Sequence, residues 1–103
     1  MIAFDSPEGA TLRELQPSRS AILSIWLTAL DRGEDTWAAW ARDALASTRP
    51  DAEVVALRFL QAAREGDERA MRQMWAVLGS FPAGPSASPA VKAAHDLRPS
   101  LPF

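Results

Sequence analysis

The sequence contains no cysteine and no tyrosine, and His95 is its only histidine. Without cysteine the chain can form neither a disulfide nor a thiolate metal site. A Ser-His-Asp catalytic triad would have to use this one histidine as its base. The neighbouring Asp96 would also point to a different face of a helix than His95 does. We therefore interpret His95 as a surface residue and expect no enzyme, no catalytic residue, no metal site and no cofactor.

Net charge is small and long hydrophobic runs are missing. The chain has 11 Lys and Arg against 13 Asp and Glu, a net charge of −2. Nucleic-acid-binding domains usually have a basic excess, so we expect no nucleic-acid partner. The most apolar stretch, 21–30, is half of the roughly 20 residues that a membrane-spanning helix needs. Segment 1–5 lacks the basic and apolar pattern of a signal peptide, and together these features predict a small acidic cytoplasmic protein without membrane association.

What the sequence does contain favours helix. Alanine is abundant and β-branched residues are few, a composition typical of helices. The chain aligns with itself at an offset of 33 residues, which pairs Pro17 with Pro50 and Gly33 with Gly66. Proline near the start of a helix and glycine just past its end are common boundaries. The alignment indicates an internal repeat, although two ordinary hairpins could also converge on the same boundary residues.

We therefore predict an all-α fold of two tandem αα-hairpins, 17–49 and 50–81, forming a compact four-helix array. The size of the chain, 103 residues, suits one domain. Helices are expected at 18–32, 37–47, 50–65 and 68–78. Ser18 and Asp67 are suited to capping the first and fourth of them, and Asp35 or Thr36 the second, with Gly33 and Gly66 in the left-handed conformation at the turns.

The two ends of the chain differ from the predicted hairpins. Segment 1–16 is expected to be partly irregular, with one helical turn near 11–15. Segment 82–103 is a Pro/Ala/Ser-rich tail, because it holds five of the eight prolines. Within it, Ser88 offers a cap and Pro89 a first helical residue for a short fifth helix.

The first predicted helix is apolar on nearly every side between 21 and 30. A helix of this kind is normally buried all round, and three other helices cannot easily cover it completely. It therefore either lies at the centre of the array or presents a face that another protein covers. Its small, weakly polar face is formed by Ser20, Ser24 and Thr28, and we name these three as candidate partner-binding residues.

Three further residues are candidates for partner binding. Packing in the core is the interpretation that we prefer for the tryptophans, but if one of them is exposed we expect it to be Trp37. Tryptophan is also enriched at interface hot spots. Leu101 and Phe103 end a proline-containing tail, and extended tails of this type can dock in the grooves of partner proteins.

Two acidic pairs, Glu34-Asp35 and Asp67-Glu68, follow the predicted turns. Carboxylates bind hard cations, so the pairs allow a metal-dependent hypothesis. The same residues are also favoured at helix N-termini, where they cap and complement the helix dipole. Since no calcium-loop ladder follows either pair, helix capping is the interpretation that we prefer.

These features predict a non-enzymatic protein–protein interaction module, such as an adaptor, an assembly subunit or an inhibitor of a larger complex. Its partner would be another protein or a further copy of the chain. One alternative is a small inhibitor protein encoded by a phage or mobile element, with which the size and mild acidity are compatible. A further alternative is a carboxylate-based metal-dependent enzyme, which would require the two acidic pairs to converge.

Overall fold

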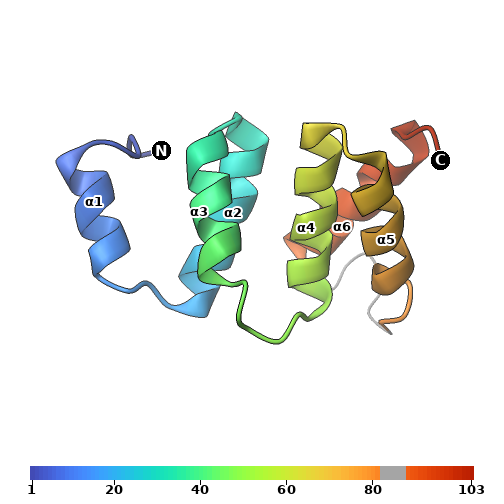
Figure 1. Cartoon of the computed structure of the whole chain (residues 1–103), viewed down its shortest axis with the longest axis horizontal. Helices are drawn as coiled ribbons and strands as arrows, with labels where there is room; N and C mark the ends of the chain where they lie inside the picture. The colour runs from blue at the N-terminus through green and yellow to red at the C-terminus, as the bar shows by residue number, and fades with distance from the viewer. Residues whose placement is uncertain (82–87) are drawn as a thin grey trace. The chain divides into compact units, whose positions relative to one another are not determined.

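The computed structural model describes residues 1–81 and 88–103, and every regular element within them is helical (Figure 1). In chain order the elements are α1 (Pro7–Glu14), α2 (Arg19–Arg32), α3 (Asp35–Ala44), α4 (Ala52–Glu65), α5 (Glu68–Leu78), α6 (Pro89–Leu97) and the short 3-10 helix η1 (Arg98–Ser100). The predicted all-α class is confirmed. No helix in these residues has both the length and the apolar character that a membrane crossing needs.

Helix ends follow the local chemistry of the sequence. The side chains of Ser18 and Asp67 each accept a hydrogen bond from the backbone N–H three residues later, at 3.2 and 3.1 Å. Gly33 ends α2 with φ of 72°, and Gly66 ends α4 with φ of 73°. Left-handed glycine at this position satisfies the last helical carbonyl groups. The predicted caps and turn glycines are confirmed at these four positions.

The described residues form two units, Met1–Thr48 and Arg49–Phe103. In the first unit α2 packs against α3. The side chains buried on these two helices are Leu23, Trp26, Ala29, Trp37, Ala38 and Ala41, and Leu45 is buried just after α3.

The N-terminal helix of this unit is longer than the turn expected near 11–15. α1 begins at Pro7, because the Ser6 hydroxyl caps it by accepting a hydrogen bond from the Gly9 N–H at 3.1 Å. Proline is well suited to the first helical position, since its missing N–H would have no helical partner there. Ser6 and Gly9 are only three residues apart in the sequence, so this cap depends on local sequence alone.

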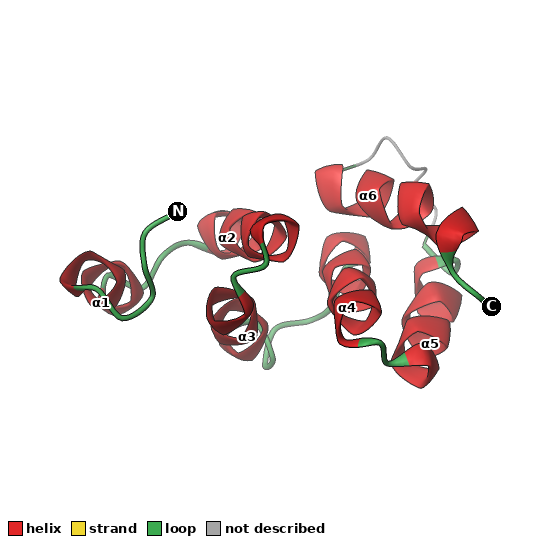
Figure 2. Cartoon of the chain, turned by 90° about the horizontal axis from the view of Figure 1, so that it is seen from above, coloured by secondary structure: helices red, strands yellow, loops and turns green. Residues whose placement is uncertain are grey.

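In the second unit α4 packs against both α5 and α6 (Figure 2). The Ser88 hydroxyl caps α6 by accepting a hydrogen bond from the Val91 N–H at 3.2 Å, so the expected fifth helix is present. Its residues Ala90, Val91 and Ala94 are buried, together with Phe59 of α4. Residues 89–97 therefore belong to the packed unit, whereas residues 82–87 of the expected tail lie outside the described part of the chain.

Candidate protein-interaction surface

The acidic residues beside the second turn already have structural roles. The Asp67 carboxylate caps α5, and Glu68 pairs with Arg72 one turn later at 3.0 Å. Glu34 occupies the N-cap position of α3, but its carboxylate makes no capping hydrogen bond within the described residues. Residues 1–81 and 88–103 contain no cluster of three or more side chains able to hold a metal ion.

The polar face of α2 is open to solvent at two of its three positions. Ser20 and Ser24 are exposed, whereas Thr28 is half-buried. The neighbouring apolar side chains Ile22 and Ile25 are also only half-buried. The structure therefore leaves part of the predicted apolar helix accessible.

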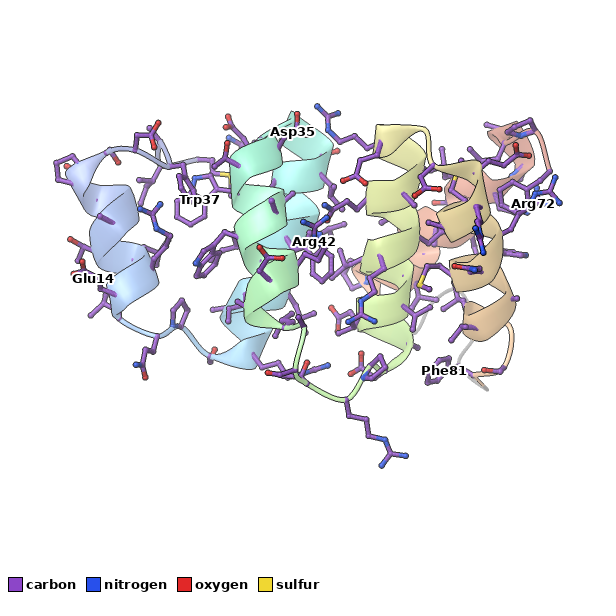
Figure 3. The ribbon with its side chains drawn as sticks, in the orientation of Figure 1. Glu14, Asp35, Trp37, Arg42, Arg72 and Phe81 are labelled. Atoms are coloured by element: carbon purple, nitrogen blue, oxygen red, sulfur yellow. The ribbon has the colours of Figure 1, made fainter. Side chains whose placement is uncertain are left out.

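Trp37 is fully buried, with 0% of its surface exposed, as packing in the core predicts; its candidate role as an exposed partner-binding residue is therefore wrong. The N-terminal segment covers it (Figure 3). The Phe4 ring meets the Trp37 indole edge-on, with 5.0 Å between ring centroids, and the indole N–H donates to the Ile2 carbonyl at 2.7 Å. Contacts across more than thirty residues of sequence decide this burial, and helix periodicity carries no information about them.

The C-terminal residues expected to form an extended, partner-binding tail make contacts within their own unit. The Arg98 guanidinium lies over the Phe103 ring at 4.2 Å, and that of Arg72 lies 5.2 Å from the same ring. Leu101 and Phe103 are both half-buried. His95, expected at the surface, is half-buried as well, and its ring meets Trp75 edge-on with centroids 5.1 Å apart. Phe103 thus already contacts Arg72 of α5 and Arg98 of η1.

A different surface is built around α1. Arg13 donates a hydrogen bond to the Phe4 carbonyl at 2.7 Å, and its guanidinium stacks 3.7 Å above the Phe4 ring. Gly9 lets the chain pass close to α1 here, because a β-carbon at this position would lie 2.7 Å from the Phe4 carbonyl oxygen. These contacts fix segment 1–5 between α1 and Trp37.

Residues of α1 and of the N-terminal segment also line an open groove of about 460 Å³. We call it the α1 groove, and its lining residues are Ile2, Pro7, Glu8, Thr11, Leu12 and Leu15. Leu15 is 71% exposed and Ile2 46%, the two highest exposures among the large hydrophobic side chains of the described residues. Apolar side chains thus gather on a surface that the rest of the unit leaves open.

The sequence analysis missed the α1 groove. Leu12 and Leu15 are three residues apart, a spacing that places them on one face of a helix. This signal was available in the sequence. The third apolar contributor, Ile2, lies in the N-terminal segment, and its carbonyl accepts a hydrogen bond from Trp37, a contact that local sequence does not encode.

Comparison with protein-family models, with curated proteins and with solved structures finds no match for this chain. The residues named above are therefore the only guide to what the α1 groove does.

Proposed function

We propose that this chain is a non-enzymatic protein-interaction module and that the α1 groove is its main binding surface. The observation that carries the proposal is the exposure of Leu15, 71% of its surface, beside Ile2 and Leu12 in one groove. Apolar side chains gathered in one open groove are typical of sites that another protein covers. Groove recognition of a partner helix or peptide commonly uses such apolar anchors.

A comparison of free energies indicates how tightly the groove alone can bind a partner. Burying one leucine or isoleucine side chain completely is worth about 1.5–3 kcal/mol. Three such side chains, each already partly covered, therefore supply several kcal/mol. Association itself costs about 4–15 kcal/mol, because the two molecules lose translational and rotational entropy. The groove alone would bind weakly, so a stable complex requires further contacts around it.

The groove is well suited to binding because its walls are already fixed. Arg13 and Trp37 both hold the backbone of segment 1–5 by hydrogen bonds at 2.7 Å. A surface that is ordered before binding loses less conformational entropy in the complex.

Site-specific photo-crosslinking in the cells that make this protein tests the proposal. A photoreactive phenylalanine analogue would replace Leu15 and, in a control variant, the exposed Ser47 of the same unit. We expect Leu15 to give a discrete adduct of higher mass that is absent from the Ser47 control. Equal adducts from both positions, or none from Leu15, would contradict the proposal.

A further inference from the structure

The acidic side chains of this protein are concentrated in the unit that carries the α1 groove. Unit Met1–Thr48 contains four basic and seven acidic side chains, whereas unit Arg49–Phe103 contains seven basic and six acidic ones. The charge that a partner meets near the groove is therefore more negative than the net charge of −2 suggests.

The local arrangement around α1 increases this asymmetry. Arg13 is the only basic side chain of segment 1–16, and it is turned inward onto Phe4, with its guanidinium 3.7 Å from the ring. Asp5, Glu8 and Glu14 remain exposed, and Figure 3 shows Glu14 at the end of α1. None of these three carboxylates forms an ion pair with the described residues. The charged side chains that segment 1–16 presents outward are thus all acidic, and one of them, Glu8, lines the groove itself.

We propose that the α1 groove binds a segment of a partner protein in which apolar side chains are flanked by lysine or arginine, an inference that rests on the function proposed above. The apolar side chains would cover Ile2, Leu12 and Leu15, while the basic ones would approach Glu8 and Glu14. Complementary charge around an apolar contact sets both the choice of partner and the rate of association.

A second copy of the chain fits this surface less well. A two-fold contact places the same face of each copy against the other. The Glu8 side chain of one copy would then approach the acidic groove of its partner, and like charges at an interface disfavour binding.

Fluorescence anisotropy with the full chain and three designed peptides tests the inference. The first probe is an amphipathic peptide of about 16 residues with leucines at i, i+3, i+4 and i+7 and lysines along both edges. The second carries glutamate in place of every lysine, and the third carries glutamine there. We expect the lysine peptide to bind about tenfold more tightly than the glutamate peptide at low salt, with the difference shrinking as salt is added.

Variants of the chain separate the apolar part of the contact from the charged part. Leu15→Ser should weaken binding of the lysine peptide about tenfold, because a large exposed apolar side chain is lost. The double variant Glu8→Gln and Glu14→Gln should weaken it about fivefold and leave the glutamine peptide unaffected. Val77→Ser is the matched control, since Val77 is 41% exposed and belongs to the other unit, and it should change nothing.

Two results would overturn the inference. One is equal binding of the lysine and glutamate peptides, or binding insensitive to Leu15→Ser. The other is a dimer, seen by sedimentation, that Leu15→Ser dissociates, because the occupant would then be a second copy. Crosslinking at Leu15 in cells without charge discrimination by the peptides would leave the proposed function standing and reject only the basic partner. Charge discrimination by the peptides without a cellular adduct at Leu15 would reject the proposed function, and with it the inference that rests on it.

Discussion

Gly9 is the residue on which the geometry of the N-terminal unit depends most directly. Alanine is the better helix former by about 1 kcal/mol, so helix propensity alone predicts that Gly9→Ala stabilises α1. The added methyl group, however, would clash with the Ala3 carbonyl oxygen and lie 2.7 Å from that of Phe4, and both are backbone atoms that cannot rotate away. We expect the steric term to dominate and the variant to lose about 1–3 kcal/mol of unfolding free energy, as overpacked sites do. Thermal unfolding followed by circular dichroism measures the change.

Gly79 provides the matched control for this substitution. It lies at the end of α5 with φ of −64°, and a β-carbon there would have its nearest neighbours at 3.6 Å. Gly79→Ala should therefore leave stability unchanged or raise it by about 0.4–1 kcal/mol, because it restricts the unfolded chain without strain. A loss of stability for Gly79→Ala as large as that for Gly9→Ala would show that contact with Phe4 is not the cause.

At the scale of single helices, the two positions that the 33-residue offset pairs, Glu34 and Asp67, differ in what they do. Asp67 accepts a hydrogen bond from the Ala70 N–H at 3.1 Å, whereas the Glu34 side chain makes no capping bond within the described residues. Asp67→Ala should thus destabilise the protein by about 1 kcal/mol. Glu34→Ala should cost only the smaller helix-dipole contribution, about 0.3–1 kcal/mol at most.

Urea unfolding at neutral pH, read by circular dichroism, measures both substitutions. Asp67→Asn serves as the rescue variant, because asparagine caps a helix about as well as aspartate does. If Asp67→Asn were as destabilising as Asp67→Ala, the role of Asp67 would be electrostatic and not that of a cap.

Helix ends could be predicted because their determinants lie within three or four residues of each other. The caps at Ser18 and Asp67 and the left-handed turns at Gly33 and Gly66 are of this kind. Trp37 could not be placed in the same way, because its cover, Phe4, comes from more than thirty residues earlier in the chain. An element's face can be read from sequence, but the segment that covers it depends on tertiary contacts.

The same reasoning explains why the candidate site was only partly predictable. Phe103 was expected to be free for a partner because the prolines around it favour extended backbone. Its ring instead contacts the guanidinium groups of Arg72 and Arg98, at 5.2 and 4.2 Å from the ring centroid. The α1 groove was missed for a related reason, since Ile2 lies in the N-terminal segment and its carbonyl accepts a hydrogen bond from Trp37, a contact that local sequence does not encode.

At the scale of the whole molecule, the division into two units implies that a substitution that destabilises one core need not unfold the other. Regions of a protein often unfold locally, with different free energies. Val91 of α6 is 1% exposed and belongs to the core of unit Arg49–Phe103.

Val91→Ala should therefore lower the local stability of the second unit. Removing two buried methyl groups leaves a small cavity and costs about 1–2 kcal/mol. We expect faster hydrogen exchange in α4, α5 and α6, with α2 and α3 unchanged. Leu45→Ala, at a residue that is 2% exposed in the first unit, is the reciprocal control and should accelerate exchange in α2 and α3 alone. Equal acceleration in both units for either variant would mean that the two cores unfold as one cooperative body, because a loss confined to one core can spread only through energetic coupling to the other.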